Sequence, residues 1–246
     1  MYKRQLLVRA VGPTLTTLGV PGAIPATQLT VYSGTTMIAQ NTGWSSTTDG
    51  GAAVAAAGST VGAFTLAKGS ADSAIVGTFA PGSYTASIAG VGSDTGIALA
   101  EVYDLDTLPP FSTQKLINVS TRGNVGSGAS IMIGGIHISG ETPKLLLIRG
   151  DGPALAAMGV SGALTAPHLQ LFNNAGTLIR ENYSWQTGND PAVLAAAASQ
   201  TGAFALADNS ADSAILIVLP PGNYTAELSG TDSATGIGLV EVYEIP

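Results

Sequence analysis

The chain has 246 residues, of which 45% are hydrophobic and only 10% are charged, and its formal net charge is −7. This length fits one or two domains, and the low charge with ample apolar content excludes a disordered chain. The negative balance argues against nucleic acid as a partner, because a phosphate backbone requires a basic surface. With no Cys and only two His, the chain offers no thiolate chemistry and little basis for a metal site. We therefore expect no cofactor and no bound metal.

No apolar run reaches the ~18 residues that a membrane helix needs, since Gly, Ser, Thr or a charge interrupts each one, and we expect no membrane insertion. The start of the chain, Met1–Gln5, leads into a run that is too short for a signal-peptide core. The Gly-rich, Cys-free, acidic composition favours a secreted or cell-surface location, with any export signal outside this chain.

An internal repeat dominates the sequence. The motif Leu7-Val8-Arg9-Ala10-Val11-Gly12-Pro13 returns 140 residues later as Leu147-Ile148-Arg149-Gly150-Asp151-Gly152-Pro153. Towards the end of each copy, Ser-Ala-Asp-Ser-Ala-Ile, Pro-Gly-x-Tyr-Thr-Ala and Glu-Val-Tyr recur in the same order. The chain therefore contains two copies of one module, and we predict domains at 1–106 and 114–246, joined by a Pro-rich linker at 107–113.

Taken in chain order, the first copy carries the same strand pattern as the second, but a weaker helix signal where Asp49-Gly50-Gly51 replaces Asn189-Asp190-Pro191. After the linker come two strand-like runs, at 116–120 and 130–138, separated by a Gly-rich turn at 123–128. Short apolar or alternating runs then predict strands at 145–149, 168–173, 177–181, 213–219, 223–229 and 236–244. Short helices are expected from Pro153 to Met158 and from Pro191 to Gln200. We expect an all-β chain of two tandem antiparallel β-sandwich, jelly-roll-like modules with short helices in their connections.

The first copy has no counterpart of the two strands that open the second copy. Only Met1–Gln5 precede Leu6, whereas Lys115–Pro143 precede the equivalent position in the second copy. Either the first module lacks its N-terminal two strands, or the chain is a fragment of a longer array and Met1–Gln5 is a boundary sequence. We favour the fragment, because losing two strands would expose open sheet edges.

Several of these motifs together resemble a known type of module. Arg122-Gly-x-Val-Gly-x-Gly, Ile-Gly-Gly-x-x-Ile-Ser-Gly, Leu-Ile-Arg-x-x-Gly-Pro-x-Leu, Asn-x-x-Trp and Thr-Gly-x-x-Leu-x-Glu-Val-Tyr resemble an uncharacterised tandem β-sandwich module of large secreted or surface proteins of Gram-negative environmental bacteria. The final third is similar, more weakly, to the pre-peptidase C-terminal type of β-sandwich domain. The resemblance implies an accessory or structural module and brings no catalytic residues.

Two repeated arginines, Arg9 and Arg149, lie in apolar strands, where an unpaired guanidinium would be costly to bury. Each needs a carboxylate, and the equally repeated acids offer two choices, Glu101 and Glu241 or Asp72 and Asp212. We predict structural ion pairs. Arg149-Gly150-Asp151 spells an adhesion tripeptide, but the first copy does not repeat it, which indicates a chance match.

Each copy also has one Trp after an Asn, namely Asn41 with Trp44 and Asn182 with Trp185. These residues form either a platform on which a sugar ring stacks or a plug at the end of the sandwich. The loop aspartates show no calcium-loop spacing, so they are assigned to turns.

We therefore expect a non-catalytic extracellular or cell-surface structural module that associates with itself or with neighbouring modules, building filaments or arrays by strand complementation. The alternative is a carbohydrate-binding or adhesion accessory module of a secreted protein, with a polysaccharide partner. A hydrolase is the least favoured interpretation, since no nucleophile elbow or triad pattern occurs and no catalytic residue stands out.

Overall fold

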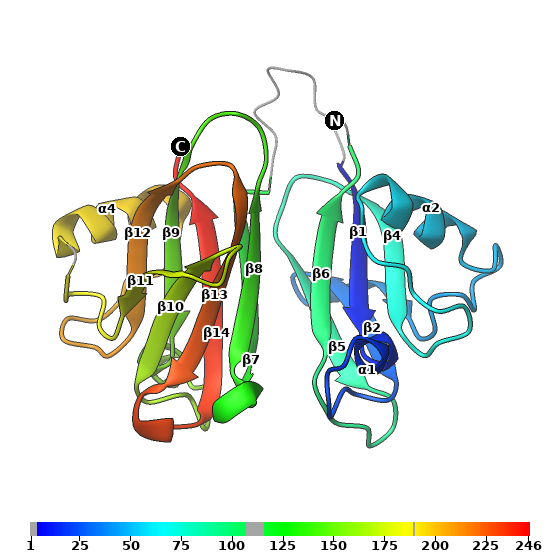
Figure 1. Ribbon diagram of the computed structural model, residues 1–246, viewed down its shortest axis with the longest axis horizontal. Coiled ribbons are helices and arrows are strands. Elements are labelled where there is room, and N and C mark those ends of the chain that lie inside the picture. The colour runs from blue at the N-terminus through cyan, green and yellow to red at the C-terminus, as the bar shows by residue number, and fades with distance from the viewer. Residues whose placement is uncertain (1–3, 107–115, 189) are drawn as a thin grey trace. The chain divides into compact units, whose positions relative to one another are not determined.

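The structure is a computed structural model that describes residues 4–106, 116–188 and 190–246. Its strands form four antiparallel sheets, two in each of two units that span Met1–Gln114 and Lys115–Pro246 (Figure 1). The expected all-β sandwich class, with a few short helices in the connections, is confirmed. The linker expected at 107–113 lies outside the described residues.

In unit 1, each sheet has three strands, in the orders β4-β1-β6 and β3-β2-β5. Its elements are β1 (Arg4–Val11), α1 (Pro13–Thr17), β2 (Thr27–Ser33), β3 (Thr36–Asn41), α2 (Ala52–Thr60), β4 (Ser73–Phe79), β5 (Tyr84–Gly90) and β6 (Leu99–Asp104). Arg4 and Gln5 thus belong to the first strand, while residues 1–3 lie outside the described chain.

In unit 2, each sheet has four strands, in the orders β12-β9-β14-β7 and β11-β10-β13-β8. Its elements are β7 (Asn118–Val125), β8 (Met132–Ile138), β9 (Lys144–Asp151), α3 (Pro153–Ala157), β10 (Pro167–Asn173), β11 (Leu178–Asn182), α4 (Pro191–Thr201), β12 (Ser213–Leu219), β13 (Gly222–Gly230) and β14 (Gly236–Glu244), with short 3-10 turns at Gly128–Ser130 and Thr231–Ser233.

Except for the strand predicted at 116–120, whose counterpart β7 continues to Val125, the predicted strands of the second copy agree with the structure to within about two residues at each end, as expected for boundaries. One prediction is wrong: Gly123–Val125 form the end of β7 rather than a turn. They pair with β14, where Gly123 lies opposite Gly238 and Val125 opposite Gly236. The turn begins only at Gly126, whose amide bonds to the Ser130 carbonyl.

The sheet that contains β9 is covered on both faces, which explains the nearly continuous apolar sequence of this strand. Leu146 and Ile148 point into the core between the two sheets. Leu147 faces the other way and packs with Trp185 and Leu194 from the segment that carries α4. Figure 1 shows α4 beside β12, and α2 beside β4 in unit 1. Each unit is therefore a sandwich with a further layer on one sheet.

A Gly-Pro turn ends the first strand of this repeat in both units. Gly12 and Gly152 allow a close backbone approach, because a Cβ at Gly152 would lie 2.0 Å from the Leu164 carbonyl oxygen. Pro13 and Pro153 then start the short helices α1 and α3, as expected for Pro at the first helical position. Both turns bring backbone amides next to the sheet, where they need acceptors.

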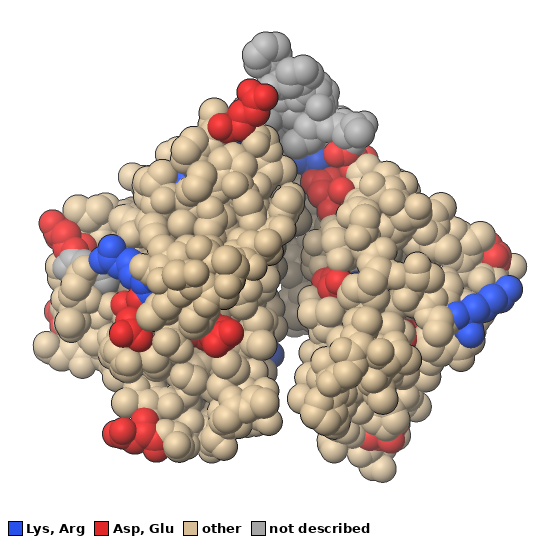
Figure 2. All heavy atoms as spheres, in the orientation of Figure 1, with Lys and Arg blue, Asp and Glu red and all other residues tan. Residues whose placement is uncertain are grey.

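None of the helices in the described part of the chain is long and apolar enough to cross a membrane. On the face drawn in Figure 2, charged side chains are few and scattered among uncharged residues, in keeping with the 10% charged content.

Candidate functional site

Arg9 and Arg149 both lie buried beneath the layer that covers their sheet. The Arg9 Nε lies 2.9 Å from Glu101 Oε2, its Nη1 donates to the Phe64 carbonyl at 2.8 Å, and its guanidinium lies 4.3 Å from the Phe64 ring centroid. Only 2% of the Arg9 side chain is exposed. Arg9 and Glu101 form a pair because they lie opposite each other on β1 and β6.

The second unit repeats this arrangement and adds a carboxylate. Arg149 Nε lies 3.4 Å from Glu241 Oε2, and Nη1 donates to the Phe204 carbonyl at 2.8 Å. In addition, Arg149 Nη2 lies 3.0 Å from Asp151 Oδ2, and neither of these two side chains is exposed. Burial raises the pKa of Asp151 well above its ordinary value despite Arg149, and the negative charge of Glu241 adds to the rise.

A tyrosine completes each network. Tyr103 donates to Glu101 Oε1 at 2.6 Å, and Tyr243 donates to Glu241 Oε1 at 2.7 Å. Burial and the hydrogen bond to Glu101 raise the pKa of Tyr103 to about 12, and the same causes raise the pKa of Tyr243. Both phenols therefore stay protonated at neutral pH, and each donates a hydrogen bond that fixes the glutamate of its network.

Asp72 and Asp212 do not pair with the arginines, so that half of the sequence prediction is wrong. Asp72 Oδ1 accepts from the Gly12 amide at 2.8 Å and from the Thr14 amide, and Asp72 Oδ2 accepts from the Thr14 hydroxyl. Asp212 accepts from the Gly152 amide at 2.8 Å and from the Ala154 amide. These carboxylates satisfy the amides of the Gly-Pro turns, where the helix N-terminus also favours negative charge.

Asp151 is the carboxylate of these networks that sequence reasoning missed, and the two tyrosines were not predicted either. Residues two apart on a strand share a face, so Arg149 and Asp151 necessarily point the same way. That spacing is present in the sequence, but there it forms part of the Arg-Gly-Asp tripeptide, whose absence from the first copy indicates a chance match to an adhesion motif. The structure buries both charged side chains of the tripeptide and pairs them, which leaves it no surface for adhesion.

The two tryptophans fill the interior of their units. Trp44 and Trp185 are each 6% exposed, and their indole Nε1 atoms donate to the carbonyls of Ala67 and Ala207 at 3.0 and 3.1 Å. The asparagine three residues before each tryptophan supports neighbouring backbone. Asn41 Oδ1 accepts from the Ala74 amide at 3.0 Å, and Asn182 Oδ1 accepts from the Ala214 amide at 2.9 Å. This is the arrangement of a plug, and no broad ring face is left for a sugar.

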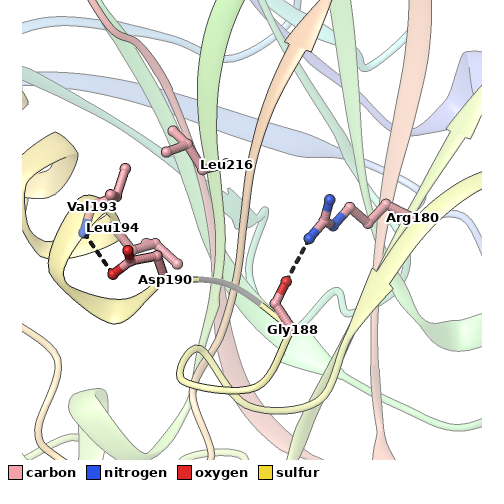
Figure 3. Close-up of a pocket in the computed structure, with 6 residues that line it drawn as sticks. All are labelled: Arg180, Gly188, Asp190, Val193, Leu194 and Leu216. Atoms are coloured by element: carbon pink, nitrogen blue, oxygen red, sulfur yellow. Dashed lines mark hydrogen bonds between the residues drawn. The ribbon is translucent and has the colours of Figure 1, made fainter.

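One cavity of about 420 Å³ lies between β11, β12 and the start of α4 (Figure 3). Its polar side chains already serve the fold: Arg180 donates to the Gly188 carbonyl at 2.7 Å, and Asp190 caps α4 by accepting from the Ala192 amide. Within the described ranges, no group of three or more His, Asp or Glu side chains is arranged to hold a metal. The side chains of Arg180 and Asp190 in this cavity thus already bond to the protein's own backbone.

The clearest difference between the units lies at one side of the sandwich. In unit 2, β7 pairs with β14 and β8 pairs with β13, so that each sheet gains one strand on the same side. The equivalent strands of unit 1 are β6 and β5, and no described strand pairs with their outer edges. We call this pair of edges the open side of unit 1.

Residues on the open side are more exposed than their counterparts. Ala226 on β13 is fully buried, whereas Ala86 on β5 is exposed. Val242 is packed against the core of unit 2, whereas Val102 on β6 is 38% exposed. The open side therefore combines unpaired backbone with accessible apolar side chains, which is the chemistry of strand addition.

No family model and no curated protein matches this chain. Among solved structures, the pre-peptidase C-terminal domain of a collagenase from Bacillus anthracis aligns with 51% of this chain and 89% of its own length, at 11% identity and a TM-score of 0.32. The VP2 subviral particle of infectious bursal disease virus aligns with 98% of this chain and 56% of its own, at 10% identity and a TM-score of 0.19. A pre-peptidase domain is thus among the structural neighbours, but both similarities are too weak to assign a function.

Proposed function

We propose that this chain is a non-catalytic structural module that joins neighbouring β-sandwich modules through the open side of unit 1. The observation that carries the proposal is internal: unit 2 has the same six strands plus β7 and β8, which cover the edges that no described strand covers in unit 1. A secreted or cell-surface setting suits such a module and stays a prediction from composition.

The charged residues also favour a structural role. The repeated Arg, Asp and Glu side chains are buried and bonded to one another or to backbone. General acid-base chemistry needs a carboxylate or imidazole within reach of a substrate, whereas these groups lie beneath the covering layers.

Light scattering on the full chain over a range of concentrations tests the proposal. We expect assembly that increases with concentration, because unpaired edges of one copy can pair with those of another. Ala86→Lys places a charge on the inner face of β5 beside the missing strand and should reduce the assembled fraction. Thr85→Lys, the matched control, places the same charge on the opposite face of the same strand.

A second arm covers the open side directly. A second copy of residues 114–143 is fused to the N-terminal side of Arg4, so that it stands in the same relation to β1 as the native segment does to β9. This extended chain should remain monomeric where the original assembles. A folded chain that is monomeric at every concentration, or that assembles equally with Ala86→Lys and with the extension, would refute the proposal.

A further inference from the structure

We infer that the open side of unit 1 binds a strand pair of the β7–β8 type from a neighbouring module, with a β7-type strand on β6 and a β8-type strand on β5. This inference rests on the proposed function and adds the identity and the register of the partner. Its support comes from strand lengths, from the residues that would face the partner, and from the number of strand pairs in the chain.

The lengths of the edge strands point to a missing partner. β14 begins at Gly236, and among the described strands only β7 pairs with its first three residues, because pairing with β9 starts at Leu239. Ile237 also forms an isolated bridge with Ala163, as the equivalent Ile97 of unit 1 does with Ala23. β6 begins at Leu99, which is the equivalent of Leu239. β6 is therefore shorter than β14 by three residues, which are the equivalents of the three that β7 holds in the sheet of unit 2.

The same relation holds for the other sheet. Gly222 and Asn223 of β13 pair only with β8, and pairing with β10 reaches no further than Tyr224. β5 begins at Tyr84, the equivalent of Tyr224. Binding of a strand pair should thus extend β5 back to residue 82 and β6 back to residue 96.

Four of the positions that would face the partner are nearly the same in both units. The strand pair of unit 2 contributes four buried apolar side chains to the core, namely Val125, Met132, Ile136 and Ile138. They lie opposite Gly236, Leu228, Tyr224 and Gly222. The equivalents in unit 1 are Gly96, Ile88, Tyr84 and Gly82. Three of these four acceptor positions are identical, and the fourth exchanges Leu for Ile.

The partner is a strand pair additional to the one in this chain. The two units provide two places for such a pair, and β7–β8 already occupies the place in unit 2. Donating it to the unit 1 of a second copy would uncover β13 and β14 of the donor, so the exchange would leave as many open edges as before. The pair that fills unit 1 is therefore expected to be a different one from β7–β8.

Two differences between the units set the preferred side chains of this partner. A Cβ at Gly238 would lie 2.7 Å from Val125 Cγ2 in unit 2, and unit 1 has Ala98 at the equivalent position, so the partner should carry a side chain smaller than Val where the native pair has Val125. A Cβ at Gly134 would lie 3.2 Å from Val240 Cγ1, which keeps this position small in unit 2. Unit 1 has Ala100 where unit 2 has Val240, so that contact is absent. We expect the partner of unit 1 to accept Ala at the position that corresponds to Gly134.

Hydrogen exchange with a synthetic peptide tests the inference. The peptide contains residues 116–140 of this chain and is added to the full chain at the lowest concentration of the scattering series. Exchange of segments 82–90 and 96–104 should slow by about tenfold or more, since paired edge amides open far less often. The edges of β3 and β4 should exchange as before. A peptide with Met132→Asp and Ile136→Asp is the matched control and should give no protection.

A Gly134→Ala peptide should protect the same segments at least as well as the parent peptide. Absence of protection, equal protection by the control peptide, or protection of β3 and β4 instead would overturn the inference. If segments 82–90 and 96–104 are already protected in an oligomer without peptide, and the peptide neither binds nor disperses it, the partner is a second copy's edge and the inference is wrong.

The two proposals fail separately. A chain that stays monomeric but binds the peptide with the expected protection contradicts self-association and retains the strand-pair partner. If Ala86→Lys reduces assembly of the chain but the peptide does not slow hydrogen exchange, the proposed function stands and the partner assigned here is wrong.

Discussion

Two arginines, Arg9 and Arg149, are buried, and each depends on its own set of carboxylates. Arg9 has one partner, Glu101, whose side chain is 12% exposed. Arg149 has two, Asp151 and Glu241, of which Asp151 is fully enclosed. Because removing one member of a buried ion pair leaves the other without compensation, the two arginines should differ in their contribution to stability.

Arg149→Met should lower the free energy of unfolding of unit 2 by about 3–5 kcal/mol, the cost typical of a broken buried pair. Arg9→Met should cost unit 1 less, since only Glu101 is left and water reaches it. Urea unfolding checks both, because each unit has a single Trp that reports on it: Trp44 in unit 1 and Trp185 in unit 2. Equal or negligible losses in the two variants would contradict the assignment.

Asp151 gives unit 2 a pH dependence with a definite sign. Its pKa is raised by burial from the ordinary value of 3.8, so the folded state binds this proton more tightly than the unfolded chain does. The stability that comes from this group is full below the unfolded pKa and is lost as pH rises through the folded pKa. Unit 1 has Val11 at the equivalent position.

Asp151→Val should therefore gain stability relative to the parent as pH increases from about 4 towards neutrality. The measurement is urea unfolding at several pH values, followed by Trp185 fluorescence in a Trp44→Phe background. Val11→Asp in unit 1 is the reciprocal variant and should introduce the same trend there. A difference between Asp151→Val and its parent that does not change with pH would show that Asp151 titrates normally.

At the scale of residues, the sequence identified which side chains belong to the buried network better than it identified which of them pair with each other. Repetition selected Arg9, Glu101 and Asp72, but both acids fitted the need of a buried arginine equally well. The choice depends on cross-strand register, which places Glu101 opposite Arg9. It also depends on the turn amides that Asp72 accepts from, which only the folded backbone brings together.

At the scale of elements, β5 and β13 are the same strand in two environments. Both carry Tyr-Thr-Ala at the same positions, but β13 lies between β10 and β8, while β2 is the only described strand beside β5. A central strand and an edge strand tolerate different side chains, because only the central strand packs on both sides.

The substitution of Ala226 by Lys should destabilise unit 2 by about 3 kcal/mol or more, because it forces a charge into a fully buried position. Ala86→Lys should change the stability of unit 1 by no more than about 0.5 kcal/mol, as is usual for an exposed site. Thermal unfolding of the two variants, at a concentration where the chain is monomeric, gives the comparison. A loss as large for Ala86→Lys as for Ala226→Lys would mean that β5 is covered in solution.

Strand positions followed well from apolar runs and turn residues, since those signals are local. The end of β7 did not, because Gly123 and Asn124 have weak strand propensity and are held in the sheet by β14. The missing strand pair of unit 1 could be expected from the repeat. Which two edges it would leave open required the topology, since β5 and β6 are far from the start of unit 1 in sequence.

For the molecule as a whole, the extra strand pair should make the two units unequal in stability. β7 and β8 add four buried apolar side chains to the core of unit 2. Full burial of such a side chain contributes about 1.5–3 kcal/mol before the cost of ordering the segment. Unit 1 keeps the corresponding surface of β5 and β6 partly exposed to water.

We therefore expect two unfolding transitions, with unit 1 unfolding at the lower urea concentration. Trp185→Phe isolates the Trp44 signal of unit 1, and Trp44→Phe isolates the Trp185 signal of unit 2. Since each ring is buried to the same extent, the two substitutions are matched. Fusion of a second copy of residues 114–143 to the N-terminal side of Arg4 should move the Trp44 transition towards that of Trp185, because it restores the missing layer of the core. If Trp44 reports the higher midpoint, or if the extension leaves its midpoint unchanged while the chain stays folded, then unit 1 is a complete sandwich and its open side requires no partner.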